Sequence, residues 1–417
     1  AALLKHLGGP TPEGFKGSLP GLSYAVGPSD FKLRLRTSAK FVVTPIPNVI
    51  ARLRGAEDRA VILGNHRDAW VYGAADPNSG TATMLEVARG FGRLAATGWR
   101  PRRSLVLASW SGEEYGLVGS TAWAELHAKE MSKAYAYLNM DTAVSGTYLQ
   151  GSGSFALRDA FADVLDVVSG PEGGPLSKSW SRDWGVLGSG SDYTVFLDHF
   201  GVASVDFDFT RTDSNGKATS YGQYHSVYDS FDWMKNFGGG APNKSFEYMR
   251  SGAQVWGLLA LRLADRPVVP FNHSRQAEAL DRWADALPGG LDLGTLREGI
   301  AEYAAAAEAA SREALRAGGA AGLNDRLAFT ERQFLSEGGL PGRKWFRHTL
   351  QAPGIELGYG STTFPGVAEA LRAGRKGLAE EQLAVAVGCV RRAAAYLGGK
   401  APGAAGGDDA ARDMIVV

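Results

Sequence analysis

The chain has 417 residues, enough for two or three domains, one of them large enough for a deep core. Lysine plus arginine and aspartate plus glutamate each total 44, so the charge balance gives no indication of nucleic acid or an anionic membrane as partner. Cys389 is the only cysteine, which excludes an internal disulfide and a structural zinc site built on thiolates. The sequence has no run of about 20 apolar residues, so we predict no membrane span.

The N-terminal segment, residues 1–38, is rich in glycine and proline and is predicted to be loop. We interpret it as the end of a domain that lies upstream. The chain shows neither a starting methionine nor the layout of a signal peptide. Its compartment therefore stays open, and a periplasmic or secreted location is compatible with a processed chain.

Residues 39–240 alternate short β-rich runs with helical stretches, which predicts an α/β domain. Several of the runs are almost continuously apolar, which is typical of strands buried on both faces. We therefore expect a mixed sheet with a parallel centre, flanked by helices. The strand candidates are 49–55, 60–66, 104–110, 134–141 and 202–209, and the helix candidates between them are 80–98 and 120–134.

Residues 241–400 have helical periodicity and helix-forming composition, and we predict an all-α domain. Its helical stretches are 245–265, 274–287, 296–318, 322–335 and 378–398. The remaining residues, 401–417, are rich in glycine and alanine and are predicted to be a tail.

Possible metal ligands follow the first buried strand candidate. His66 ends the apolar run AVILGNH, and Asp68 comes two residues later. A carboxylate at that spacing can accept the second ring N–H of a ligating imidazole. Asp76 follows after a loop, just before Pro77, whose ring restricts the backbone.

Acidic residues also follow two further strand candidates. Glu113 and Glu114 come after SLVLASW, and Asp141 ends AYAYLNMD. Of the two adjacent glutamates, one can bind a metal while the other acts on water as general base. His225 lies in SYGQYHSVYDS, preceded by Tyr224.

Three strand ends therefore deliver a histidine or acid to one edge of the sheet, where open α/β folds place their ligand sites. The set contains two imidazoles and several carboxylates and no thiolate, which is the composition of a two-metal hydrolytic site. Each signal alone has an ordinary alternative. His66 alone can be a hydrogen-bonded loop residue, the glutamate pair can be solvated, and Asp141 can cap a helix. Spacing alone leaves both interpretations open.

Long motifs in the chain resemble the glutamate carboxypeptidase and transferrin-receptor group of zinc peptidases. They are GNHRDAWVYGAADPNSGTA (64–82), GWRPRRSLVLASWSGEEYGLVGSTAWAE (98–125), LGSGSDYTVF (187–196), YHSVYDS (224–230) and FPGVAEAL (364–371). The similarity runs from about residue 5 to 397. It implies an exopeptidase with two zinc ions, acting on short peptides, with a helical domain that forms a homodimer.

The resemblance also implies a role for each site residue. Asp76 would bridge two zinc ions, with His66 and Asp141 completing one and Glu114 and His225 the other. Glu113 would be the general base, Asp68 would orient His66, and Tyr224 would bind the oxyanion. Residues 1–38 would be the end of the protease-associated apical region, 39–240 the catalytic domain and 241–400 the dimerisation domain.

The substrate pocket departs from the glutamate-hydrolysing members. Gly151, Asp206 and Asp208 stand where those members hold acidic substrates with arginines, and Gly358 replaces the lysine that holds the terminal glutamate. Ser191, next to Gly190, replaces an asparagine, whereas Tyr359 is kept. Because the calcium-binding glutamates of some relatives align with Ala122 and Glu125, we predict no calcium site.

Strand periodicity places Asp206 and Asp208 on one face of the run SVDFDF and the apolar residues on the other. Two carboxylates there disfavour an acidic substrate and suit an α-amine or a basic side chain, which favours an aminopeptidase or dipeptidase. The alternative is that they face solvent or pair with Arg211 or Lys217.

Two other functions stay open at this point. One is a carboxypeptidase of the glutamate carboxypeptidase type. The other is a non-catalytic, transferrin-receptor-like binding protein, although all five candidate ligands and Glu113 are present. A different reaction on a related zinc fold, such as glutaminyl cyclisation, is distinguished by its products.

Overall fold

The structure, a computed structural model, describes residues 2–15, 17–29, 31–316, 321–356 and 358–400. The chain divides into two compact units, residues 1–45 and 46–417. The described part of the first unit contains the short 3-10 helix Leu4–His6 and little other regular structure. The predicted tail at 401–417 lies outside the described residues.

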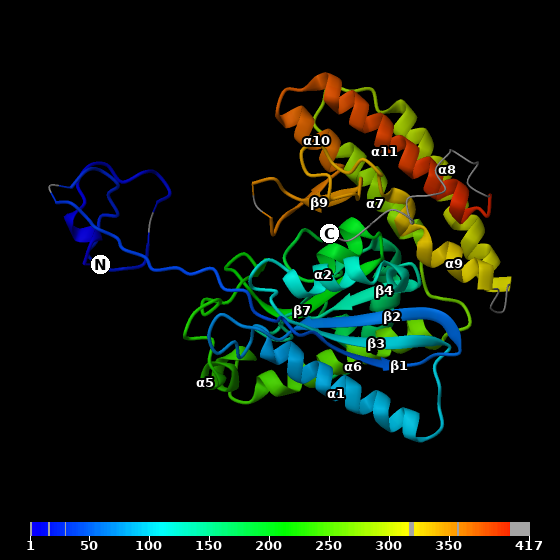
Figure 1. The fold of residues 1–417 in the computed structure, drawn as a ribbon, viewed down its shortest axis with the longest axis horizontal. Helices are drawn as coiled ribbons and strands as arrows, with labels where there is room; N and C mark the ends of the chain where they lie inside the picture. The colour runs from blue at the N-terminus through cyan, green and yellow to red at the C-terminus, as the bar shows by residue number, and fades with distance from the viewer. Residues whose placement is uncertain (1, 16, 30, 317–320, 357, 401–417) are drawn as a thin grey trace. The chain divides into compact units, whose positions relative to one another are not determined.

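A mixed sheet of eight strands forms the centre of the second unit (Figure 1). The strands are β1 (Val49–Leu53), β2 (Glu57–His66), β3 (Arg103–Trp110), β4 (Ala134–Asn139), β5 (Tyr148–Gly153), β6 (Trp184–Gly185), β7 (Ser204–Thr212) and β8 (Ala218–Thr219). Their order is β1-β3-β2-β4-β7-β5-β6, with β8 paired to β7. β3, β2, β4 and β7 run parallel, whereas β1 is antiparallel to β3. β5 is antiparallel to β7 and parallel to β6. The predicted sheet with a parallel centre is confirmed.

Helices cover both faces of this sheet because its central strands are apolar on both sides. Val61 and Leu63 of β2 belong to the core cluster beneath α1 (Asn78–Ala96) and α6 (Lys244–Asp265). Ile62, between them, belongs to the cluster on the opposite face, with Phe196 of the π-helical turn Val195–His199. That face also carries α2 (Val118–Leu126) and α3 (Ala128–Met131). The period of two in β2 thus supplies both cores.

Helix α6 differs in position from the prediction. The predicted boundary after residue 240 assigns it to the helical domain, whereas α6 packs against α1 and the central strands, as Figure 1 shows. Its apolar stripe, including Val255, Trp256 and Leu259, is fully buried there. Helical periodicity in the sequence predicts that one side of α6 is buried, but it does not predict whether that side packs against a sheet or against other helices.

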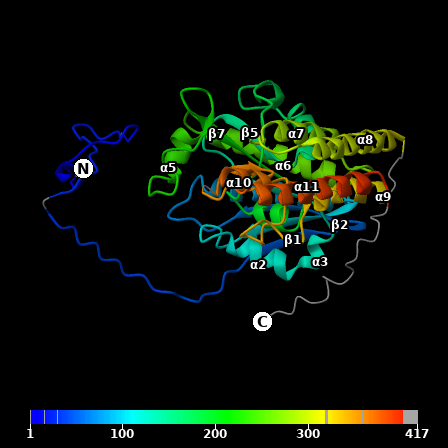
Figure 2. The same ribbon diagram turned by 90° about the horizontal axis from the view of Figure 1, so that it is seen from above.

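The C-terminal part of the unit is helical, apart from a hairpin of β9 (Gln351–Pro353) and β10 (Ser361–Thr363). Its helices are α7 (His273–Asp285), α8 (Gly294–Arg316), α9 (Ala321–Phe329), α10 (Pro365–Arg372) and α11 (Lys376–Leu397). α8 and α11 lie side by side, as Figure 2 shows, and Arg391 of α11 pairs with Glu298 of α8 at 3.2 Å. The sequence did not predict α4 (Arg158–Leu165) or the short α5 (Phe231–Trp233) in the preceding part.

Among the described residues, no helix has both the length and the apolar character required to cross a membrane.

Candidate metal centre

The site lies where neighbouring parallel strands end. β2 ends at His66, β3 is followed by Glu113 and Glu114, and β4 is followed by Asp141. Because β2 lies between β3 and β4 in register, these three strand ends meet at one edge of the sheet. The edge brings together the groups that the sequence analysis singled out.

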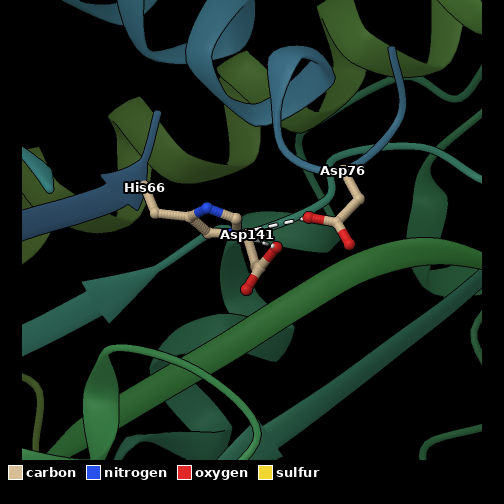
Figure 3. A group of neighbouring side chains, drawn as sticks. All are labelled: His66, Asp76 and Asp141. Carbon is tan, nitrogen blue, oxygen red and sulfur yellow. Dashed lines mark hydrogen bonds and ion pairs between the residues drawn. The ribbon is translucent and has the colours of Figure 1, made fainter. Parts of the chain in front are cut away.

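The first triad consists of His66, Asp76 and Asp141, whose ligand atoms all lie within 4.8 Å of one another (Figure 3). Nε2 of His66 lies 2.9 Å from Oδ1 of Asp141 and 3.3 Å from Oδ1 of Asp76. Figure 3 shows the imidazole and both carboxylates pointing toward a common centre. Two carboxylates and an imidazole at this spacing are a donor set for a divalent metal.

The second triad consists of Asp76, Glu114 and His225. Nε2 of His225 lies 3.2 Å from Oδ2 of Asp76 and 3.1 Å from Oε2 of Glu114. Asp76 therefore has one oxygen toward each imidazole. His225 adopts a left-handed backbone conformation, with φ of 55°, which is rare for a non-glycine residue. The turn that carries it aims the ring at Asp76.

Asp68 contacts His66 and the Glu113–Glu114 turn, but its contact with His66 is not the carboxylate contact that was predicted. Its main-chain carbonyl, rather than its carboxylate, lies 2.9 Å from Nδ1 of His66, and the carboxylate is 3.7 Å away. The carboxylate accepts the main-chain N–H groups of Glu113 and Glu114 at 3.1 and 3.2 Å. Asp68 thus fixes the position of the Glu-Glu turn relative to His66.

Asp229 supports the loop that carries Asp76, and the sequence analysis missed it. Its carboxylate accepts the main-chain N–H groups of Ala75 and Asp76 at 2.7 and 3.1 Å and the hydroxyl of Tyr221 at 2.9 Å. The only signal in the sequence was its place in the motif YHSVYDS, four residues after His225.

A hydrogen-bonded chain holds Asp141 from the other side. The hydroxyl of Ser191 donates to Oδ2 of Asp141 at 2.6 Å, and the amide of Asn139 donates to Ser191 at 3.0 Å and to Asp206 at 2.9 Å. Gly190 lines the same wall and donates its main-chain N–H to the hydroxyl of Tyr193. Asn139 was not predicted, because a buried amide at a strand end carries no distinctive sequence signal.

The carboxylates of the site crowd one another. Burial, together with Asp141, raises the pKa of Glu113 to about 9. Burial and Asp76 raise the pKa of Glu114 to about 7. Burial opposes ionisation of Asp141 too, but the nearby His66 outweighs it and lowers the pKa of Asp141. Oδ1 of Asp76 and Oε1 of Glu114 are buried without a hydrogen-bond partner in the described part of the chain.

Both triads open into a cavity of about 1140 Å³. Six carboxylates line it, those of Asp76, Glu113, Glu114, Asp141, Asp206 and Asp208. No lysine or arginine is found among the described lining residues. The helical part of the chain contributes Trp345, Phe346 and Tyr359 to the wall.

The predicted substrate-binding residues all reach this cavity: Gly190, Ser191, Asp206, Asp208 and Tyr359. Val205, Phe207 and Phe209 are buried on the opposite face of β7, as strand periodicity predicts. Within the described residues, neither Asp206 nor Asp208 forms an ion pair with Arg211 or Lys217. The hydroxyls of Tyr224 and Tyr359 lie 3.0 Å apart at the cavity, and the ring of Tyr224 stacks on His225.

Two family models match the chain. A model of peptidase family M28 matches residues 48–237, and a model of the transferrin receptor-like dimerisation domain matches residues 273–398.

Curated proteins similar to the chain include carboxypeptidases and aminopeptidases. A probable glutamate carboxypeptidase of Arabidopsis thaliana is 40% identical over 372 residues, covering 85% of this chain and 53% of the relative. Another, from Arthroderma benhamiae, is 37% identical over 406 residues, covering 90% and 54%. An aminopeptidase of Rattus norvegicus is 32% identical over 449 residues, covering 95% and 59%. The chain thus spans little more than half the length of these relatives.

Proposed function

Residues 48–237 of the chain belong to peptidase family M28 and residues 273–398 to the transferrin receptor-like dimerisation domain family, and from this premise we propose that the chain is a zinc-dependent exopeptidase acting on short peptides. The observation that carries the proposal is that two triads of possible metal ligands share Asp76. The carboxylate of Glu113, which belongs to neither triad, lies beside them.

The residues fit two zinc ions. The donors are imidazole nitrogens and carboxylate oxygens, which zinc accepts, and each triad supplies three of the four ligands that zinc usually takes. Asp76 and Glu114 each have a buried oxygen that lacks a hydrogen-bond partner among the described residues, within a group of mutually repelling carboxylates. A cation bound there would stabilise these oxygens. Asp76 would bridge, His66 and Asp141 would hold one ion, and Glu114 and His225 the other. Bound zinc would polarise the scissile carbonyl and make water more acidic.

Glu113 would then transfer a proton from the attacking water to the leaving nitrogen. Glu113 belongs to neither triad, and its Oε2 lies 3.8 Å from Nε2 of His66. The positive charge of bound zinc would counter the burial that raises the pKa of Glu113 and would favour its carboxylate form. In the proposed reaction this carboxylate takes a proton from the attacking water as the new C–O bond forms. It returns that proton to the leaving nitrogen as the C–N bond breaks. The hydroxyl of Tyr224 donates a hydrogen bond to the oxygen that becomes negative.

The charge of the cavity favours the amino end of a peptide. A glutamate side chain would meet six carboxylates and no cationic side chain among the described lining residues. The chain is therefore proposed not to be glutamate-specific. A free α-amine would be attracted by Asp206 and Asp208, which supports an aminopeptidase or dipeptidase.

One observation favours a carboxypeptidase as the second candidate. The hydroxyls of Tyr224 and Tyr359 lie 3.0 Å apart and both residues line the cavity. Because one hydroxyl donates to the other, the pair offers one free hydroxyl hydrogen to a terminal carboxylate, and a second when the bond between them breaks. Neutral donors hold a carboxylate less strongly than a cationic side chain does.

The test is to load the full chain with zinc, incubate it with a mixed peptide library and identify the products by mass spectrometry. The expected result is stepwise removal of residues from the amino end, absent in the Glu113→Gln variant. Removal from the carboxyl end would support the second candidate. Two bound zinc ions without cleavage would refute the peptidase, and failure to bind zinc would favour a non-catalytic binding protein.

We also propose that the helical domain pairs two chains into a homodimer, since residues 273–398 belong to a dimerisation family. Light scattering on the purified chain should give twice the mass of one chain, and a monomer at micromolar concentration would contradict this.

A further inference from the structure

The floor of the cavity beyond the two triads is formed by the second half of β7. Asp206, Asp208 and Thr210 follow one another at every second residue along it, so their side chains share one face of the sheet. All three line the cavity together with Gln150, which lies opposite Asp208 in the neighbouring strand β5. This is a row of oxygen atoms that leads away from the metal centre.

The row has a near end and a far end. Asp206 pairs in register with Asn139, the last residue of β4, and Asn139 links it through Ser191 to Asp141. Asp208 lies two residues farther along β7, a rise of about 6.6 Å. Asp206 is therefore the acid beside the reacting centre, and Asp208 is the more distant one.

The two acids have no cationic partner within the described part of the chain. Neither forms an ion pair there, and the described residues that line the cavity include no lysine or arginine. Burial raises the pKa of Asp206 to about 7 and also raises that of Asp208. Among the described residues, the one side chain that donates a hydrogen bond to Asp206 is the neutral amide of Asn139. A cationic ligand would supply the missing countercharge.

We propose that Asp206 and Asp208 form a two-point site for an N-terminal lysine, with Asp206 contacting the α-amine and Asp208 the side-chain ammonium. This inference rests on the proposed exopeptidase function, since the α-amine of the residue removed must lie next to the scissile carbonyl. The lysine side chain then extends along β7 over a length that matches the spacing of the two carboxylates. Gln150 and Thr210 offer the ammonium further acceptor oxygens.

A third metal ion is a poorer occupant of this row. A divalent cation needs several ligands, and within the described residues no third histidine, cysteine or acid joins Asp206 and Asp208 in a ligand cluster. Ammonium groups need only hydrogen-bond acceptors, of which the row has several.

The experiment compares two tripeptides on the zinc-loaded full chain, Lys-Ala-Ala and norleucine-Ala-Ala. Norleucine has the same carbon chain as lysine and lacks the side-chain amine. We expect kcat/KM to be roughly 10- to 100-fold higher for the lysine peptide, the value of one hydrogen-bonded ion pair. Asp208→Asn should remove most of this preference. Asp206→Asn should lower kcat/KM for both peptides, because both carry the α-amine.

The matched control is Asp166→Asn, which removes the same charge from an exposed position outside the cavity. It should leave both rates and their ratio unchanged. A third peptide, with the lysine side-chain amine acetylated, should behave like the norleucine peptide.

A binding measurement separates this inference from the proposed function. Calorimetry should show that cadaverine, a five-carbon diamine, binds the zinc-loaded chain at least tenfold more tightly than pentylamine, and that Asp208→Asn abolishes the difference. Equal cleavage of both peptides with equal binding of both amines would overturn the two-point site and leave the exopeptidase intact. Cadaverine binding that depends on Asp208, without cleavage of any peptide, would support the site and refute the peptidase.

Discussion

Glu113 occupies a position at the site that differs from that of its neighbour Glu114. It is beside His66 but outside both ligand clusters, so its carboxylate is free to exchange a proton with water. We expect Glu113→Gln to lower kcat by roughly 10²- to 10⁴-fold, the usual contribution of a general base. Zinc content, measured by atomic emission, should stay unchanged. Glu337→Gln, at an exposed position, is the control, and loss of zinc from Glu113→Gln would show that this residue is a ligand instead.

Gly80 is required by the close approach of α1 to the end of β4. A Cβ atom there would lie 2.1 Å from the main-chain oxygen of Asp141 and 2.6 Å from that of Met140. Gly80→Ala should therefore displace Asp141, weaken zinc binding and destabilise the protein by about 1–3 kcal/mol.

Gly90 gives the matched comparison on the same helix, because a Cβ atom there would meet no atom of the described residues within 4 Å. Gly90→Ala should raise the free energy of unfolding by about 0.5–1 kcal/mol through helix propensity. Urea denaturation measures both variants, and equal stability changes would show that α1 can move away from β4 at no cost.

Asp206 should make stability depend on pH. Its pKa is raised by burial from its ordinary value of 3.8 to about 7 in the folded chain, so folding favours its protonated form. The stability contributed by that proton is present below about pH 4 and is lost as the pH rises to about 7. Asp206→Asn cannot ionise, so the difference in unfolding free energy, variant minus wild type, should increase from pH 4 to pH 7. A difference that is independent of pH, measured by urea denaturation, would contradict this.

The buried side chain of Asp229 holds the loop between β2 and α1 at the end next to α1. Asp229 accepts two main-chain N–H groups next to Asp76, the residue that both triads share. Asp229→Asn should therefore weaken zinc binding at both positions, by roughly 10- to 100-fold, as is usual for residues that orient metal ligands. Competition with a chelator measures the affinity. Asp232→Asn, at a nearby exposed position, is the control, and an unchanged affinity in Asp229→Asn would show that the loop is rigid without it.

The elements that the sequence predicted well are those with a strong apolar pattern. The runs at 60–66, 104–110 and 134–141 became β2, β3 and β4 to within three residues, and their ends carry the candidate ligands. Because three consecutive buried strands end in polar residues, the edge where these residues meet could be predicted. β5, with the sequence YLQGSG, was missed because glycine and serine interrupt its pattern.

The contacts that support the site could not be predicted in the same way. Asp229 and Asn139 act through distances set by the tertiary fold, over separations of 154 and 52 residues along the chain. Helix α6 shows the same difficulty, since its periodicity is compatible with packing on a sheet or on other helices.

For the whole molecule, zinc should act as a stabilising ligand. Six carboxylates lie in one cavity with no lysine or arginine among its described lining residues, and metal binding would offset their repulsion in the folded state only. At a free zinc concentration 100 times Kd, the stabilisation is about 2.7 kcal/mol. Removing zinc with a chelator should therefore lower Tm by several degrees, and adding zinc should restore it. The comparison by scanning calorimetry uses magnesium as the control, and an unchanged Tm would contradict zinc binding to the folded chain.

The wall that the helical part adds to the cavity has a consequence for biosynthesis. The last candidate ligand is His225, whereas Tyr359 emerges from the ribosome 134 residues later. At about 5–20 residues per second, this interval lasts about 7–27 s. A nascent chain therefore contains all five proposed zinc ligands, and also Asp206 and Asp208, well before the last part of the cavity wall has been synthesised. If the proposed zinc ligands can assemble at that stage, metal binding could precede closure of the cavity by the helical part of the chain.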